Sequence, residues 1–465
     1  MQYISTRGQA PKLNFKETFL TGLASDGGLY VPEYYPQIST SEIASWQKLD
    51  YVSLCYEIFR KYTGNTIKAA TLKKLIAASY NDKFFHHSAI APLKQFNEKL
   101  FLLELFHGET LAFKDFALQL MGNFLEHFLK ENKEKAVILG ATSGDTGSAA
   151  INGCKHAKNA DIYILHPYQR TSEIQRKQMT SVTAKNVFNI AIEGNFDDCQ
   201  NIVKTIFVEQ DFLKGQKRLI AVNSINWLRI MSQIVYYFYA AFRLGAPFRR
   251  VSFAVPTGNF GDIFAGYVAK QMGLPIDKLI IATNKNDILH RFIRKNSYNM
   301  SKLEKSLSPS MDIQISSNFE RLLFAAHNND ATQIATLMTK FKKTGKLSVA
   351  KPIHQKICTD FLSSSCSDAD TTKIMQQIAK ATGEIIDPHT ATAIAAYHEH
   401  GKKLAQPFIC LATAHPGKFP AALTKAKLTT NLPKRLADCL DKTEKYDILP
   451  DNQSQVVNYI TKHSL

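Results

Sequence analysis

Short apolar runs alternate with longer stretches of helical pattern from about residue 100 onward. The runs that predict β-strands lie at residues 136–139, 162–166, 187–192, 219–222, 251–255, 279–282 and 408–412. Between most of them, apolar residues recur at three- and four-residue steps, which is typical of helices that bury one face. Strands that alternate with helices favour a parallel arrangement, so we predict an α/β fold of parallel sheets flanked by helices.

The same pattern divides the chain into three parts. Residues 1–88 contain a turn-rich segment at 25–32 and otherwise mostly helical pattern, so we expect a separate N-terminal unit. Residues 89–430 carry the alternating strands and helices, and residues 431–465 are expected to form surface helices. Residues 299–317, which contain a Ser-Pro-Ser sequence, are expected to be irregular.

The composition is that of a globular protein without a membrane span. Of the 465 residues, 45% are apolar and 21% are charged, and no apolar run approaches the ~20 residues that cross a bilayer. The first residues lack the apolar core of a secretion signal, so we expect a cytoplasmic protein. The seven cysteines are scattered and form no CxxC pair, which argues against a metal site or a disulfide framework.

The formal net charge of +17 allows two interpretations. A basic protein can attract nucleic acid or anionic metabolites, or it can simply have a solvated, lysine-rich surface. Lysines and arginines are spread through the chain, and no nucleic-acid-binding motif accompanies them. We therefore expect no nucleic-acid partner, while a preference for phosphorylated small molecules stays open.

Lys114 lies at the start of a strongly apolar helical pattern. Behind it, apolar side chains recur on one helix face, at Phe116, Leu120, Met121, Phe124, Leu125 and Phe128. Partial burial disfavours the ammonium form of a lysine, and a neutral amine is what a Schiff base with a carbonyl requires. The alternative is a lysine whose stem packs on apolar surface while its charge reaches water.

Two glycine-rich loops follow predicted strands, where ligands bind in open α/β sheets. The first, residues 140–150, contains the hydroxyl groups of Thr142, Ser143 and Thr146 beside Asp145, and it opens a helix whose free N–H groups suit an anion. It lacks the Gly-Lys-Ser/Thr ending of a nucleotide-binding P-loop. A capping loop, with Asp145 or Thr146 as the N-cap, explains the pattern equally well.

The second loop, residues 256–262, contains two glycines before another helical pattern. It suits a phosphate group, although a tight structural turn has the same pattern. A further segment, residues 412–419, follows the last predicted strand, so Thr413 is expected at the same sheet edge. His415 in this segment is expected to be structural, since nothing in the sequence sets its pKa or gives it a partner.

A buried lysine, two anion-binding loops and a late threonine together resemble the threonine synthases, which belong to the tryptophan-synthase-β group of pyridoxal phosphate enzymes. The resemblance runs almost from end to end. Its motifs are YISTRG at residues 3–8, DGGLYVP at 26–32, FHGETLAFKD at 106–115, NSINWLR at 223–229 and SPSMDIQISSNFER at 308–321. It implies a tryptophan synthase β-like (fold type II) enzyme, with a cofactor-binding region of two interleaved subdomains at residues 89–430.

The resemblance also implies a role for each candidate residue. Lys114 would hold pyridoxal 5'-phosphate as a Schiff base and later shuttle protons. The cofactor phosphate would be lined by Gly258, Asn259, Phe260 and Asp262. Thr413 would form a hydrogen bond with the pyridine nitrogen. The loop that resembles the substrate-carboxylate loop contains Thr142, Ser143, Asp145 and Thr146. The substrate phosphate would meet Ser224, Asn226 and Arg229.

Asp145 is unexpected on physical grounds, because it is an anion in a loop that should meet a carboxylate. The branch of threonine synthases that the chain resembles also has an aspartate here, so the resemblance still implies activity. We expect the Asp145 side chain to cap backbone N–H groups and to point away from the substrate carboxylate.

The implied reaction converts O-phospho-L-homoserine and water into L-threonine and phosphate, the last step of threonine biosynthesis. It requires no metal, and a monomer or homodimer is expected. A lyase that uses the same cofactor and releases ammonia and a keto acid is one alternative. A basic binding protein that has kept the fold without catalysis is another, disfavoured because Lys114, both glycine loops and Thr413 are present.

Overall fold

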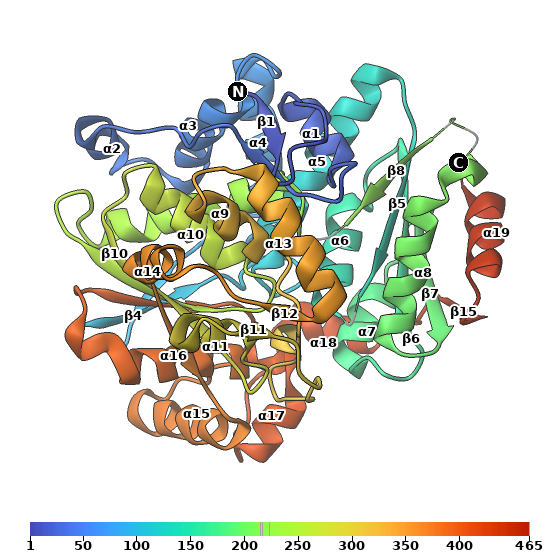
Figure 1. Cartoon of the computed structure of the whole chain (residues 1–465). Helices are drawn as coiled ribbons and strands as arrows, with labels where there is room; N and C mark the ends of the chain where they lie inside the picture. The colour runs from blue at the N-terminus through green and yellow to red at the C-terminus, as the bar shows by residue number, and fades with distance from the viewer. Residues whose placement is uncertain (143, 214, 216, 223, 465) are drawn as a thin grey trace.

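The structure is a computed structural model that describes residues 1–142, 144–213, 215, 217–222 and 224–464. Two sheets flanked by helices form its centre (Figure 1). The larger contains, in spatial order, β13 (Phe361–Ser365), β10 (Ile276–Thr283), β9 (Val251–Pro256), β14 (Phe408–Ala412), β4 (Leu100–Glu104) and β3 (Leu93–Gln95). The smaller contains β15 (Asp447–Pro450), β7 (Val187–Glu193), β6 (Ala160–Pro167), β5 (Ala136–Ala141) and β8 (Arg218–Ala221).

Strand pairing in both sheets is parallel except between β3 and β4, so the predicted α/β fold is confirmed. Two short antiparallel pairs lie outside these sheets, β1 (Tyr3–Ser5) with β2 (Tyr30–Pro32) and β11 (Tyr298–Asn299) with β12 (Lys346–Leu347). Each of the seven predicted strands is present. The sequence analysis did not predict β4 or β13, which belong to the larger sheet.

The helices follow the strands along the chain. The α-helices are α1 (Phe15–Thr21), α2 (Thr40–Trp46), α3 (Tyr51–Thr63), α4 (Ala69–Ser79), α5 (Lys114–Asn132), α6 (Asp145–Cys154), α7 (Glu173–Thr180), α8 (Phe196–Val208), α9 (Trp227–Arg243), α10 (Gly261–Gln271), α11 (Ile288–Lys295), α12 (Phe319–Ala326), α13 (Ala331–Thr344), α14 (Lys351–Asp360), α15 (Asp368–Thr382), α16 (Pro388–His400), α17 (Pro420–Lys425), α18 (Lys434–Leu440) and α19 (Gln453–His463). Short 3-10 helices are η1 (Gln210–Leu213), η2 (Pro309–Met311), η3 (Gly401–Lys403) and η4 (Pro416–Lys418).

Both faces of each sheet are buried, as parallel strands require. In β5, Val137 and Leu139 pack toward α8 and α19, whereas Ile138 packs on the opposite side with α5 and α6. Figure 1 shows α8 and α19 beside the smaller sheet. In the larger sheet, alternate residues of β9 and β14 pack toward α16 or toward α9 and α10.

The last segment differs from the prediction of surface helices alone. It contains α18 and α19, but β15 lies between them and adds a parallel strand to the edge of the smaller sheet, beside β7. Val456 and Ile460 of α19 are fully buried against that sheet. The segment is therefore part of the fold, and the prediction of a purely helical extension was wrong.

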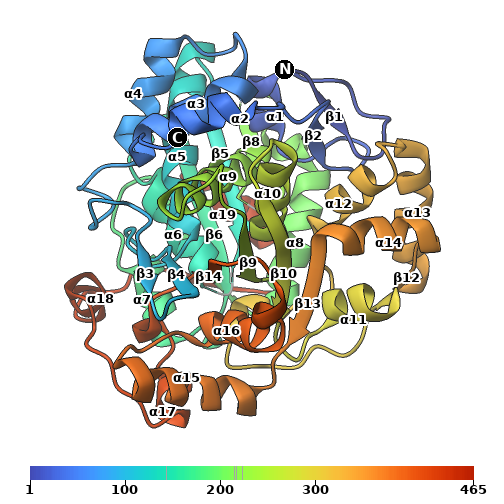
Figure 2. The ribbon, with the colours of Figure 1, turned by 90° about the vertical axis from the view of Figure 1, so that its left-hand side faces the viewer.

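The N-terminal helices pack directly on the central helices. In Figures 1 and 2 the blue N-terminal segment lies at one end of the molecule, and its side chains join the same core as α5 and α9. The ring of Tyr3 lies 6.2 Å from that of Trp227, and the ring of Phe15 lies 6.0 Å from that of Phe124. A boundary near residue 88 stays a prediction, because the segment before it shares its core with the rest of the chain.

Helices α5 and α6 touch through their backbones. A Cβ atom on Gly122 would lie 1.9 Å from the carbonyl oxygen of Gly153, and one on Gly153 would lie 2.1 Å from the carbonyl oxygen of Leu118. Only glycine permits this approach. Each of the two glycines lies eight residues, about 12 Å, after the first residue of its helix, Lys114 or Asp145. The crossing therefore brings both helix starts to the same region.

No helix in the described part of the chain is long and apolar enough to span a bilayer. The described His, Cys, Asp and Glu side chains include no group of three or more that could hold a metal ion. The described cysteines are all free thiols, and most are buried.

Gly153→Ala should lower the apparent free energy of unfolding by about 3 kcal/mol. The added methyl group would force α5 and α6 apart, and this overpacking exceeds the gain of about 1 kcal/mol in helix propensity. Urea unfolding followed by circular dichroism measures the change. Lys130→Ala, at an exposed position on α5, is the control and should change stability by less than about 0.5 kcal/mol. Equal stability of the two variants would contradict the backbone contact.

Candidate active site

The candidate residues gather where strand ends of the two sheets meet. Backbone pairing holds Lys114 next to Thr413: Ala112 forms an antiparallel bridge with Ala414, and the N–H of Phe113 donates to the carbonyl oxygen of Thr413 at 2.9 Å. The first residue of α5 is thereby fixed at the end of β14. The two residues were predicted separately, and the structure brings them together.

The Lys114 amine lies in a dry environment next to one carboxylate. Its side chain is 11% exposed, and Nζ lies 3.6 Å from Oδ2 of Asp145. Burial lowers the pKa of the Lys114 ammonium group, and the Asp145 carboxylate offsets only part of this change. The predicted desolvation of Lys114 is confirmed. Such an amine gives up its proton more readily than a surface lysine, as Schiff-base formation and proton transfer require.

Asp145 does not cap the helix that it begins, so that expectation was wrong. Its Oδ1 accepts hydrogen bonds from Lys418 Nζ at 2.9 Å and from Gln175 Nε2 at 3.0 Å, while its Oδ2 faces Lys114. Burial alone raises the pKa of this carboxyl group. The ammonium groups of Lys418 and Lys114 outweigh burial and hold the pKa of Asp145 well below its usual range.

Thr142 performs the capping that was expected of its neighbours. Its hydroxyl oxygen accepts hydrogen bonds from the N–H groups of Gly144 and Gly147, both at 3.0 Å. Ser143 lies outside the described residues. The hydroxyl of Thr146 is half-buried and has no hydrogen-bond partner among the described residues. Within the described part of this loop, Thr146 is the predicted hydroxyl that remains free to meet a ligand.

Sequence reasoning missed Lys418. Its side chain is fully buried, and Nζ donates to the carbonyl oxygen of Thr110 at 2.6 Å and to Asp145 at 2.9 Å. The only signal was its place in the segment after the last predicted strand, since residue type does not separate it from surface lysines. In the same segment, His415 Nδ1 accepts from the N–H of Gly417 at 3.1 Å, and burial lowers the His415 pKa to about 4, which supports a structural role.

The loop between β9 and α10 presents free backbone N–H groups. No described residue accepts a hydrogen bond from the N–H groups of residues 258–263. The carbonyl oxygens of Gly258 and Asn259 are occupied, because they accept from Ser316 Oγ at 2.6 Å and from Asn318 Nδ2 at 2.8 Å. Free N–H groups at the start of a helix bind anions, so this loop suits a phosphate group.

Phe260 and Asp262 fix the shape of this loop. Phe260 has a φ of 62°, an uncommon conformation for a residue with a side chain, and it turns the chain into α10. The Asp262 side chain points into the protein, where Oδ1 accepts hydrogen bonds from Tyr236 at 2.6 Å and Tyr237 at 2.8 Å. Burial raises the Asp262 pKa to about 6 despite these hydrogen bonds. A ligand therefore meets Asp262 through its backbone.

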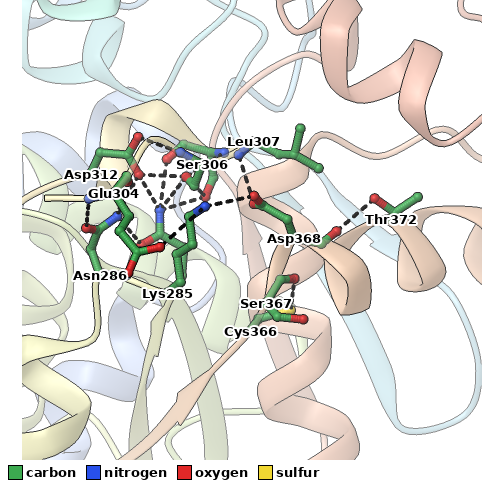
Figure 3. A network of polar contacts seen from close by, with 12 residues as sticks. Lys285, Asn286, Glu304, Ser306, Leu307, Asp312, Cys366, Ser367, Asp368 and Thr372 are labelled. Atoms are coloured by element: carbon green, nitrogen blue, oxygen red, sulfur yellow. Dashed lines mark hydrogen bonds and ion pairs between the residues drawn. The ribbon is translucent and has the colours of Figure 1, made fainter.

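A polar network anchors the irregular segment at residues 299–317 (Figure 3). Asp312 Oδ1 accepts hydrogen bonds from Asn286 Nδ2 at 3.0 Å and from Ser306 Oγ at 2.6 Å. Lys285 Nζ pairs with Asp368 at 3.2 Å. Apart from β11 and η2 the segment is irregular, as predicted, and the network gives it a defined path.

This segment reaches the site at Ser310. The carbonyl oxygen of Ser310 would lie 2.8 Å from a Cβ atom on Gly258, so only glycine fits beneath it. Ser310 Oγ also donates to Asp145 Oδ2 at 3.4 Å. The segment thus contacts both glycine-rich loops, and no local sequence pattern predicts this contact.

Two polar side chains near the helix starts have no hydrogen-bond or ion-pair partner among the residues that the structure describes. The Thr413 hydroxyl forms no hydrogen bond within the described part of the chain, although Thr413 is buried. Arg229 is 4% exposed, its Nε has no hydrogen-bond partner, and no described carboxylate pairs with it. Burial lowers the Arg229 pKa to about 10. An unpaired buried cation is unfavourable, so this position favours an anionic ligand.

Asn226 is a helix cap, and its contact with the substrate phosphate stays a prediction. Its Oδ1 accepts from the N–H of Leu228 at 3.0 Å, and its Nδ2 donates to the carbonyl oxygen of Phe19 at 2.8 Å. Its polar atoms therefore tie α9 to α1. Ser224 is half-buried, with its hydroxyl oxygen 3.1 Å from that of Ser317, and it remains near the start of α9.

The geometry fits a ligand that combines an aldehyde, a phosphate and a ring nitrogen. The Lys114 amine can form a Schiff base with the aldehyde, the free N–H groups after β9 can bind the phosphate, and the free hydroxyl of Thr413 can bond to the ring nitrogen. The Arg229 guanidinium then remains for a second anion.

Family models match almost the whole chain. Residues 2–80 match the model described as threonine synthase N terminus, residues 86–413 match pyridoxal-phosphate dependent enzyme, and residues 390–460 match threonine synthase, C-terminal. The chain is 53% identical to a threonine synthase of Pseudomonas aeruginosa, across 100% of this chain and 98% of that relative. It is 43% identical to one of Saccharomyces cerevisiae, across 91% and 88%.

Solved structures give the same result. A pyridoxal-phosphate-bound threonine synthase from Brucella melitensis superposes with a TM-score of 0.96 and 46% identity, across 100% of this chain and 99% of that one. The threonine synthase of Escherichia coli superposes with a TM-score of 0.84 and 29% identity, across 100% of both chains.

Thr142→Val should lower the free energy of unfolding by about 1–2 kcal/mol, because two N–H groups at the start of α6 lose their acceptor. Thermal and urea unfolding test this expectation. Thr142→Ser keeps the hydroxyl group and should retain most of the stability. A Thr142→Val protein as stable as the wild type would contradict the capping role and return Thr142 to the candidate ligand contacts.

Proposed function

Since the chain belongs to the threonine synthase family of pyridoxal-phosphate-dependent enzymes, we propose that the residues around Lys114 form its active site and that its substrate is O-phospho-L-homoserine. Its activity is that of a threonine synthase, which yields L-threonine and phosphate. The buried Lys114 amine, beside the free hydroxyl of Thr413, is the observation that carries the proposed site.

The cofactor is pyridoxal 5'-phosphate. Lys114 Nζ would hold it covalently, the N–H groups of Gly258, Asn259, Phe260 and Asp262 would bind its phosphate, and Thr413 would bond to its ring nitrogen. When bound, the cofactor supplies an electron sink for the charge left on the substrate after proton removal. Thr413 is a neutral hydroxyl, so it does not force protonation of that nitrogen as an aspartate would.

Lys114 would then act as the general base. Once free, Nζ would remove the proton from the substrate α-carbon and then one from the β-carbon. Removal of both protons lets the γ-phosphate leave. The γ-carbon would then gain a proton, which makes it the methyl group of threonine, and water would add its hydroxyl group at the β-carbon. Lys114 returns the α-proton at the end. The lowered pKa of Lys114, caused mainly by burial, suits a group that must alternate between amine and ammonium.

Arg229 is our proposed partner for the substrate phosphate. It is a buried cation whose Nε has no hydrogen-bond partner in the described part of the chain, and its planar guanidinium can bind phosphate through two hydrogen bonds. Ser224 near the start of α9 would assist. Thr146, with Ser143, would bind the substrate carboxylate from the start of α6. We omit Thr142 and Asn226, whose side chains serve as helix caps.

We also propose that residues 1–88, 89–430 and 431–465 are an N-terminal unit, a cofactor-binding region and a C-terminal extension. The enzyme would work in the cytoplasm as a monomer or homodimer, without nucleic acid or membrane partners. Free, mostly buried cysteines support a reducing compartment.

Lys114→Ala should abolish both the Schiff-base absorbance band and threonine formation, because no other described amine takes its place at the start of α5. Absorbance spectroscopy with added pyridoxal phosphate, followed by assays of threonine, phosphate and ammonia, measures both. Substantial threonine formation by this variant would refute the assignment. Wild-type release of phosphate with ammonia in place of threonine would favour the lyase alternative.

Arg229→Met should raise the KM for O-phospho-L-homoserine at least 100-fold and leave the affinity for pyridoxal phosphate within about threefold, since a charge-assisted phosphate contact contributes ~3 kcal/mol. The ligand-free variant should be no less stable than the wild type, because an unpaired buried cation has been removed. Steady-state kinetics and thermal unfolding measure the two effects. An unchanged KM would remove Arg229 from the phosphate site.

A further inference from the structure

Lys418 is a fully buried cation outside the roles assigned so far. It ends η4, directly after the segment that holds Thr413, and its side chain is 0% exposed. Its ammonium group has two acceptors, the carbonyl oxygen of Thr110 at 2.6 Å and Oδ1 of Asp145 at 2.9 Å. Burial of a charged group is unfavourable unless it is paired, so this lysine is retained together with its carboxylate.

The Asp145 carboxylate joins two lysines. Its Oδ1 is held by Lys418 and by Gln175 Nε2 at 3.0 Å. Its Oδ2 lies 3.6 Å from Lys114 Nζ and accepts from Ser310 Oγ at 3.4 Å. One oxygen is therefore fixed by the protein, and the other faces the amine that performs the chemistry. The Thr142 hydroxyl group accepts two backbone hydrogen bonds at the start of α6, which stabilise this position of Asp145.

Other charges also face this cluster. Arg229 on α9 and Asp262 on α10 act on Lys114 with opposite signs, and Asp115 on α5 and His415 lie near Lys418. None of them offers the close two-sided contact that Asp145 makes with Lys114 and Lys418. The dominant partner of Lys114 is thus Asp145, and the dominant partner of Asp145 is Lys418.

We propose that Lys418 is a positioning residue that acts through Asp145. It keeps the Asp145 carboxylate ionised and aimed at Lys114 Nζ, so that a counter-charge is in place whenever Lys114 carries a proton taken from the substrate. It also balances the negative charge of Asp145, which would otherwise repel the substrate carboxylate at the start of α6. The aspartate in a carboxylate-binding loop is thereby explained by a buried lysine far away in the sequence.

The inference rests on the proposed role of Lys114, and the two can fail separately. Loss of the Lys114 amine removes the Schiff-base band. A change at Lys418 leaves that amine in place, so the band should persist while the charge around Asp145 changes. The Schiff-base band therefore tests the role of Lys114. The energetic coupling between Lys418 and Asp145, measured by a double-mutant cycle, tests the role of Lys418.

The test is a double-mutant cycle with Lys418→Gln, Asp145→Asn and the combined variant, measured in the holoenzyme. Glutamine keeps a donor for Thr110 but removes the charge. We expect Lys418→Gln alone to lower kcat at least tenfold and to raise the KM for O-phospho-L-homoserine. In the Asp145→Asn background, Lys418→Gln should lower kcat less than threefold, since no carboxylate charge remains for Lys418 to balance. Equal losses in the two backgrounds would overturn the proposal.

Two further variants complete the test. Lys418→Arg keeps the charge and should retain kcat within about fivefold, whereas a loss equal to that of Lys418→Gln would contradict a charge-based role. Lys425→Gln removes an exposed positive charge from α17, and its kcat should remain within twofold of the wild-type value.

The rate at which added pyridoxal phosphate forms the Schiff-base band in cofactor-free protein gives a readout without turnover. We expect this rate to fall at least fivefold in Lys418→Gln and to be unchanged in Lys425→Gln; an unchanged rate in Lys418→Gln would count against the proposal.

Discussion

The close backbone contact between α5 and α6 constrains the rest of the molecule. Gly122 and Gly153 let the two helices cross without intervening side chains. Each glycine lies eight residues after the start of its helix, so the crossing is equally far from Lys114 and from Asp145. The amine of Lys114 and the carboxylate of Asp145, from different parts of the chain, are thereby held 3.6 Å apart. Since both are buried, small displacements of the helices would change the electrostatics of the amine strongly.

The surroundings of this pair follow from parallel sheets that end in the same region. Thr413 and then Lys418 follow strand β14, and the loop with free N–H groups follows β9. The chain after β8 continues to the start of α9, where Arg229 lies. Cations, free donors and one carboxylate therefore converge where anionic ligands of a pyridoxal-phosphate enzyme must bind. The irregular segment at residues 299–317 contacts Asp145 through Ser310, and the hydrogen bonds around Asp312 stabilise its path.

Sequence patterns predicted the fold and the burial of Lys114 at the start of α5 well, because both depend on local periodicity. The seven expected strands are present, and the apolar helix that begins at Lys114 is buried. The patterns failed where a contact joins distant segments. Asp145 was expected to cap its own helix, but its partner Lys418 lies 273 positions later. The patterns also did not predict that the Asn226 amide forms a hydrogen bond with α1. The strand β13 at the sheet edge ends in three serines, so it lacks the apolar pattern of a strand although most of it is buried.

The most direct test of the account is to locate the cofactor on the chain. The holoenzyme would be treated with sodium borohydride, which converts a Schiff base into a stable secondary amine, and then digested and analysed by mass spectrometry. The account predicts a single modified lysine, Lys114, at the start of α5. Modification of Lys418, the other buried lysine next to Asp145, or of any other lysine in place of Lys114 would contradict it.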